Sequence, residues 1–161
     1  KVVHWSFGPG EIIRVDEKEL AGYKELYYVV KMRDLTIWVP VENQERPSLR
    51  AITPANEFKK LFSILSSPAE PLPPDRLERK TYLSDLLRDG DLASICRVIR
   101  DLAMFTRGKK KNETDVQLLE RAQKFLVDEW RLSLSVTHSE AEAQLRHLLK
   151  ESLTKTSTTN N

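Results

Sequence analysis

The chain has 161 residues and a formal net charge of only +2, from 26 lysines and arginines against 24 aspartates and glutamates. This balance excludes a general polyanion binder, and a single cysteine excludes an intrachain disulfide framework. The length suits one ordinary domain or two small ones. The sequence has neither a signal peptide nor an apolar run long enough to cross a membrane, so we expect a cytoplasmic protein without membrane contact.

The first fifty residues predict a small antiparallel sheet. Two runs rich in β-branched and aromatic residues, 26–32 and 35–40, flank the polar pair Arg33-Asp34 and predict a hairpin whose turn type is open. Two more strands are expected, over 10–18 and 49–52. Short strands this close together favour a strongly bent antiparallel barrel of the SH3 or Tudor type over 1–53. Because the chain begins at Lys1 inside an expected strand, without an initiator Met, we expect a short segment before it.

Trp38 is the candidate interaction anchor on this sheet. Successive side chains of a strand face opposite ways, so if Ile37 and Val39 face inward, Trp38 faces outward. An outward tryptophan is typical of a binding site. An equally open alternative is that Trp38 covers the end of the barrel or packs on a neighbouring helix.

The chain from 54 to 153 predicts an all-helical domain, so the expected fold class is α+β. Thr53 as N-cap and Pro54 as first helical residue are expected to begin a helix with the apolar stripe Phe58, Leu61, Phe62 and Leu65. A Pro-rich segment, 66–74, resembles an SH3 ligand, but a connector between helices is favoured. Residues 154–161 predict a disordered tail.

Four more helices are expected in this half. Their predicted N-terminal caps are Asp75, Asp91, Asn112 with Asp115, and either Thr137 with Glu140 or Ser139 with Glu142. Residues 75–111 contain 10 Lys or Arg against 6 Asp or Glu, an excess of +4. Charge alone nevertheless favours an ordinary solvated face over nucleic-acid contact.

No cluster of residues predicts catalysis. Cys96 lies in the apolar stripe of the helix after Asp91, so we interpret it as a small buried residue rather than a nucleophile. His4 has no partner at metal-ligand spacing and is interpreted as structural, and no motif surrounds His138 or His147. We therefore expect no catalytic residue, metal, cofactor or small-molecule substrate, and favour a non-enzymatic protein over a Cys-His hydrolase.

Short motifs occur along nearly the whole chain, to about residue 150. In the first half they are Val2-Val3-His4, Gly8, Glu17–Gly22, Tyr27–Lys31, Val39–Asn43 and Leu49-Arg50. In the second half they are Arg88–Asp91, Val98–Leu102 and Glu120–Leu126. With these motifs the chain resembles the CarD/CdnL family of bacterial transcription regulators, whose RNA polymerase interaction domain also occurs in the transcription–repair coupling factor. The absence of helicase motifs favours the stand-alone regulator.

The resemblance implies two partners. The barrel would bind the β subunit of bacterial RNA polymerase, and the helical domain would contact upstream promoter DNA and stabilise the open complex. Lys18 and Trp38 fall where family members place polymerase-contacting side chains, and Thr36 and Pro40 share the face of Trp38. A sheet edge there also suits pairing with a polymerase strand.

The chain departs from the family at the expected DNA wedge. Family members place a tryptophan at the start of the helix after the connector, where it enters the minor groove; that position is Arg76 here. An arginine is attracted by a narrow groove but does not unstack a base step as an indole does. The predicted weak minor-groove or phosphate contacts are Arg76, Arg79, Lys80, Lys109, Lys110 and Lys111. The alternative hypothesis is a polymerase-binding adaptor with little or no DNA binding.

Overall fold

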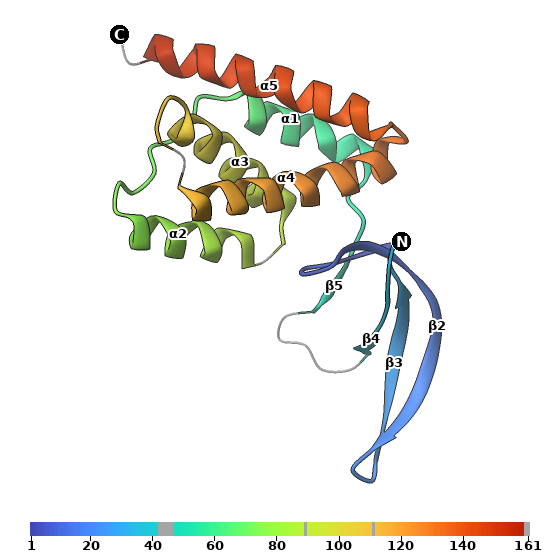
Figure 1. Cartoon of the computed structure of the whole chain (residues 1–161). Coiled ribbons are helices and arrows are strands. Elements are labelled where there is room, and N and C mark those ends of the chain that lie inside the picture. The colour runs from blue at the N-terminus through green and yellow to red at the C-terminus, as the bar shows by residue number, and fades with distance from the viewer. Residues whose placement is uncertain (42–46, 89, 111, 160–161) are drawn as a thin grey trace. The chain divides into compact units, whose positions relative to one another are not determined.

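The computed structural model describes residues 1–41, 47–88, 90–110 and 112–159 (Figure 1). The chain divides into two compact units, Lys1–Ile52 and Thr53–Asn161. The first unit is built of strands and the second of helices. The predicted α+β fold class is therefore confirmed.

In the described residues of the first unit, five strands are formed. They are β1 (Val2–His4), β2 (Gly8–Leu20), β3 (Tyr23–Lys31), β4 (Thr36–Pro40) and β5 (Leu49–Ala51). Every neighbouring pair is antiparallel, in the sheet order β4-β3-β2-β1-β5. Within the described residues no ladder joins β4 to β5, so the expected barrel is an open sheet. A small apolar cluster around Val30, Met32 and Val39 packs on one face of it.

Two tight turns connect β2, β3 and β4. Ala21 and Gly22 join β2 to β3 with φ angles of 52° and 83°. Positive φ at both central residues is what a type I′ turn requires, and its twist matches that of the flanking strands. At the turn of Arg33 and Asp34, Met32 N donates to Leu35 O over 2.8 Å. Neither of these two residues has a positive φ, which excludes types I′ and II′ there.

The part of the second unit that the structure describes contains five α-helices around one apolar core. They are α1 (Phe58–Ser66), α2 (Arg76–Arg88), α3 (Leu92–Thr106), α4 (Glu113–Leu134) and α5 (His138–Thr159), preceded by the 3₁₀ turn η1 (Ala55–Glu57). The core contains the predicted stripe of α1, with Phe58 and Leu65 fully buried beside Trp130. None of the described helices combines the length and apolar character that a membrane span needs.

The predicted caps are mostly confirmed. Asp75 accepts from two backbone N–H groups of α2, Asp91 from Ser94 N, and Asn112 from Thr114 N. Thr137 and Glu140 form the reciprocal capping box of α5, because Glu140 N donates to Thr137 and Thr137 N to Glu140. This decides between the two caps predicted for the last helix.

Two predictions about helix ends are wrong. Thr53 does not cap α1 and Pro54 is not its first residue, because the 3₁₀ turn η1 comes first, with Pro54 extended at its cap position, and α1 begins only at Phe58. The backbone of Thr53 is bonded to α4 instead: its N–H donates to Glu129 Oε1 and its carbonyl accepts from Ser133.

The predicted disordered tail is helical through Thr159. One of its hydroxyl side chains faces the connector: Thr156 Oγ1 accepts from Ala69 N over 2.9 Å. The other hydroxyl groups of 154–159 donate to carbonyl oxygens of α5 itself. The helix therefore continues through a segment whose composition favours disorder, and one of its side chains satisfies a backbone group of another segment.

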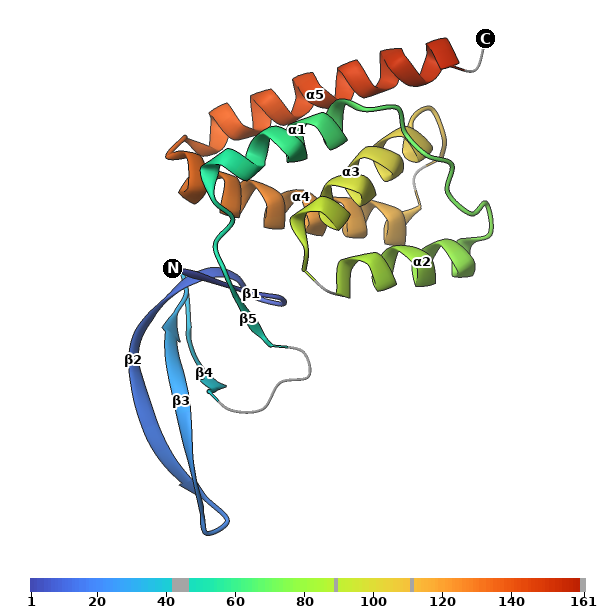
Figure 2. The ribbon, with the colours of Figure 1, turned by 180° about the vertical axis from the view of Figure 1, so that it is seen from behind.

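The connector between α1 and α2 is extended and fixed by other helices (Figure 2). Ser152 of α5 donates to Ser67 O over 2.6 Å, and Asp101 of α3 accepts from Glu70 N over 2.9 Å. Leu72 inserts into the core. The start of α2 is thus held against the rest of the helical unit.

Candidate functional site

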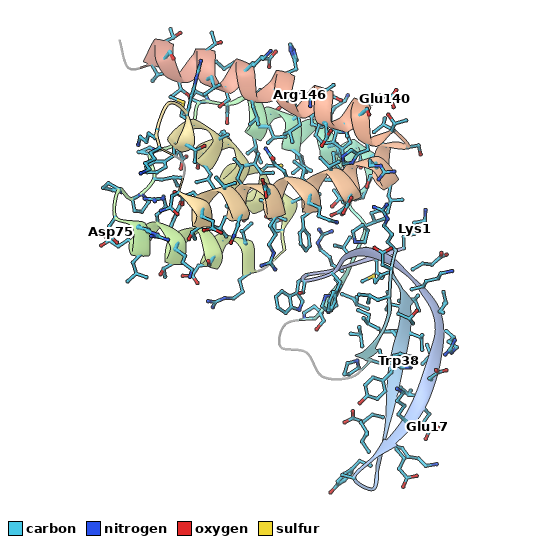
Figure 3. All side chains as sticks on the ribbon, viewed as in Figure 1. Lys1, Glu17, Trp38, Asp75, Glu140 and Arg146 are labelled. Carbon is cyan, nitrogen blue, oxygen red and sulfur yellow. The ribbon has the colours of Figure 1, made fainter. Side chains whose placement is uncertain are left out.

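The first candidate site is the face of the sheet that presents Trp38. Ile37 and Val39 pack in or against the apolar cluster on the opposite face. Trp38 is 41% exposed, as the alternation of side chains predicts. Strand pairing sets Thr36 opposite Lys31 and Pro40 opposite Tyr27, so Thr36, Pro40 and Tyr27 share this face. We call it the Trp38 face; Figure 3 labels Trp38 on β4.

Lys18 lies at the centre of the Trp38 face. Its Nζ is 4.1 Å from the centre of the Trp38 ring and 5.9 Å from the centre of the Tyr27 ring. The structure therefore brings into contact two of the four residues that were predicted as partner contacts on this sheet, one from β2 and one from β4. The cation–π contact orients the indole and keeps the ammonium group at the surface.

The carboxylates of this face already have partners within the sheet. Asp16 pairs with Arg14 over 3.0 Å, and Glu25 accepts a hydrogen bond of 2.8 Å from the Tyr27 hydroxyl. The bond to Glu25 raises the pKa of Tyr27. Among the described residues neither Lys18 nor Glu25 forms an ion pair, and the partner of Glu25 is a neutral phenol, so the face presents one ammonium and one carboxylate charge that no ion pair neutralises.

The two long edges of the sheet differ in charge. β4 is an edge strand whose five residues are all uncharged. On the other side, β1 pairs only with residues 8–10 of β2, so the rest of that edge of β2 is unpaired. This unpaired part of β2 contains a bulge between Ile12 and Arg14 and the run 16–19, in which every residue is charged. Charges and bulges protect a strand edge from added strands. The β4 edge lacks both protections.

The second candidate site was the basic surface around the start of α2, and Arg79 does not belong to it. Its guanidinium makes a two-point ion pair with Asp115, with Nε–Oδ1 3.1 Å and Nη2–Oδ2 2.9 Å. Nη1 donates to the carbonyl oxygens of Pro73 and Pro74. Both side chains of the pair are only 5% exposed. The charge and donors of Arg79 are thus used inside the unit, which counts against the prediction that Arg79 contacts DNA.

The remaining basic residues gather near this buried pair. The ring of Phe105 lies 4.3 Å from the Arg79 guanidinium and 3.8 Å from Lys109 Nζ. Arg76 donates to Thr114 Oγ1 over 3.2 Å, at the start of α4. Lys80 and Lys110 are exposed, and Lys111 lies outside the described residues. The start of α2 and the basic loop after α3 thus lie at the same end of the helical unit.

Several of these residues were not predicted as parts of a site. Tyr27 was noted only as an aromatic of the strand, although its alternation with Tyr28 could have placed it beside Trp38. Asp115 was predicted as part of a helix cap. Its partner Arg79 is 36 positions away, and no local pattern connects the two.

Two residues considered for chemistry have structural surroundings. His4 Nδ1 accepts from the N–H groups of Ser6 and Phe7 over 3.0 and 3.3 Å, and burial lowers the pKa of His4. Burial raises the pKa of the Cys96 thiol to about 12, so the thiolate that a nucleophile needs is scarce. Among the described residues, no three His, Cys, Asp or Glu side chains gather as a metal site.

The chain thus combines an open sheet that presents a lysine–tryptophan pair with a helical unit that has a basic end. Residues 60–146, from α1 into α5, match the family model described as the C-terminal domain of CarD. The chain belongs to the CarD family. It is also 24% identical over 148 residues to "Putative transcription factor YdeB" of Bacillus subtilis (strain 168), covering 88% of this chain and 94% of that protein.

Proposed function

We propose that the protein is a bacterial transcription regulator that binds the RNA polymerase β subunit through the Trp38 face and β4. Membership of the CarD family and the similarity to a protein named as a transcription factor support regulation of transcription. The observation that most supports the docking face is the Lys18–Trp38 contact, an exposed aromatic and cation held together beside an uncharged strand edge. An added strand on β4 would supply main-chain hydrogen bonds, and Trp38 would supply a side-chain anchor.

The test is the affinity of the full chain for purified β subunit. Trp38→Ala is expected to weaken binding by about 2 kcal/mol or more, as loss of an interface anchor does. Trp5→Ala is the matched control, because Trp5 is similarly exposed, at 49%, but lies in the loop before β2. If both variants bind like wild type, the Trp38 face is not the docking site.

We further propose that the helical unit contacts upstream promoter DNA weakly and stabilises the open complex. The candidate contacts are Arg76, Lys80, Lys109 and Lys110, near the starts of α2 and α4. If about three phosphates are contacted, the slope of log affinity against log salt should be about −3. A much steeper slope on an isolated duplex would contradict so small a contact.

The alternative is a polymerase-binding adaptor with little DNA contact, and the burial of Arg79 favours it. Arg76 also has a partner within the unit, Thr114. Footprints of promoter DNA with polymerase, with and without the protein, separate the two. A regulator that contacts DNA extends or strengthens upstream protection, whereas an adaptor binds polymerase and leaves that protection unchanged.

A further inference from the structure

The β2–β3 hairpin continues well past the end of β4. β4 pairs with Tyr27–Lys31 only, while the β2–β3 ladder runs on to the pair Leu20–Tyr23 at the Ala21-Gly22 turn. At this tip Leu20 is 57% exposed and Tyr23 is 76% exposed. These two large, largely apolar side chains are cross-strand neighbours and form an exposed patch on a projecting turn, which makes the tip a candidate interaction site.

The tip lies on the same face as Trp38. Cross-strand pairs alternate between the two sides of the ladder, and the pairs Asp16–Tyr27, Lys18–Glu25 and Leu20–Tyr23 fall on one side. Tyr23 is six residues along β3 from Val29, which pairs with Trp38. At about 3.3 Å per residue, the tip and Trp38 are about 20 Å apart along the strand. Lys18 lies between them.

The tip is held in a defined position. Ala21 adopts the left-handed conformation that glycine favours, with φ 52°, so the two-residue turn is kept at the cost of an unfavourable backbone angle. Behind the tip, Lys24 pairs with Glu17 over 3.5 Å on the opposite face. Leu20 and Tyr23 therefore project from a short, regular turn rather than from a long loop.

We propose that Leu20 and Tyr23 form a second anchor of the Trp38 face and enter an apolar recess of the RNA polymerase β subunit. This inference rests on the proposed binding of that subunit. A stable interface covers about 800 Å² per partner, a patch roughly 30 Å across, which the Trp38–Lys18 contact alone does not fill. An interface that extends along the Trp38 face to the tip comes closer to this width, with the ring of Trp38 at one end and the ring of Tyr23 at the other.

The experiment compares the two faces of the same hairpin in the full chain. Val15 and Leu26 lie on the face opposite Lys18 and are 51% and 47% exposed, so they are matched controls for the tip. Affinity for purified β subunit is measured for Tyr23→Ala, Tyr23→Phe, Val15→Ser and Leu26→Ser. We expect about a tenfold loss or more for Tyr23→Ala, and changes within about twofold for the other three.

The outcomes distinguish this inference from the proposed function. If Trp38→Ala weakens binding and Tyr23→Ala does not, the second anchor is wrong and the docking face stands. Equal losses in Tyr23→Ala and Leu26→Ser also overturn it, because the effect then belongs to the hairpin rather than to one face. If wild type does not bind the β subunit, both proposals fall. If Tyr23→Ala instead converts a dimer to a monomer in sedimentation, at unchanged affinity, the tip contacts a second copy of the chain.

Discussion

Asp115→Asn tests whether Arg79 is held inside the helical unit. The two side chains form two hydrogen bonds of 2.9 and 3.1 Å and are almost fully buried. Removing the negative charge leaves a buried guanidinium without its counter-ion, which costs about 3 to 5 kcal/mol. In a domain of about 100 residues, each kcal/mol shifts Tm by about 4 °C or more, so we expect a fall of about 12 °C or more. The fall in Tm is measured by following the helical circular dichroism signal of the full chain during heating.

The control is Asp128→Asn, which removes an exposed ion pair with Lys124 on α4. Such helical surface pairs contribute only about 0.3 to 0.5 kcal/mol, so Tm should change by about 2 °C. The double variant Arg79→Met, Asp115→Leu should recover much of the lost stability, because it removes both buried charges together. If Asp115→Asn melts like the control, the pair does not stabilise the unit, and Arg79 returns to the set of candidate DNA contacts.

Three further predictions concern single residues. Arg76→Trp should lengthen the lifetime of promoter complexes challenged with competitor, at low and high salt alike, because an inserted indole depends little on charge; a shorter lifetime would remove Arg76 from the DNA surface. Cys96 should resist thiol reagents at pH 8 in the native protein and react after unfolding, since burial raises its pKa to about 12; rapid native labelling would contradict the buried position. Burial lowers the pKa of His4 from 6.5, so the neutral ring is favoured in the fold, and the stability of the strand unit should fall as pH drops below about 6.5. His4→Asn should remove that pH dependence, measured as the shift of the urea midpoint between pH 8 and pH 5.

Local sequence patterns correctly predicted the features that depend on a single segment of the chain. The caps at Asp75 and Asp91 and the outward direction of Trp38 depend on neighbouring residues and on the two-residue period of a strand, and all three are confirmed. These local rules could not predict the contact between Lys18 and Trp38, because the two residues lie on β2 and β4, and β3 lies between these strands. Only the resemblance to known proteins placed the two residues at one site before the structure did.

Long-range pairing explains the failures. Arg79 was expected at the surface because it is a charged residue. Its burial depends on the ion pair with Asp115, the carbonyl groups of the connector and the ring of Phe105. The segment 154–159 had the composition of a disordered tail, but it continues α5, and Thr156 accepts a hydrogen bond from Ala69 N. In both cases a polar side chain was expected to face water, and it instead satisfies a buried group from a distant segment.

The bonds between α5 and the connector also affect how long the helical unit takes to complete during synthesis. Ala69 and its partner Thr156 are separated by 87 residues. At about 5 to 20 residues per second, the ribosome needs about 4 to 17 s to make the second after the first. During that interval the connector lacks the hydroxyl groups that satisfy its backbone, and the end of α1 lacks the helix that covers it. The serine- and threonine-rich segment 154–159, although it has the composition of a dispensable extension, is therefore made after the connector and supplies a hydroxyl group that fixes it.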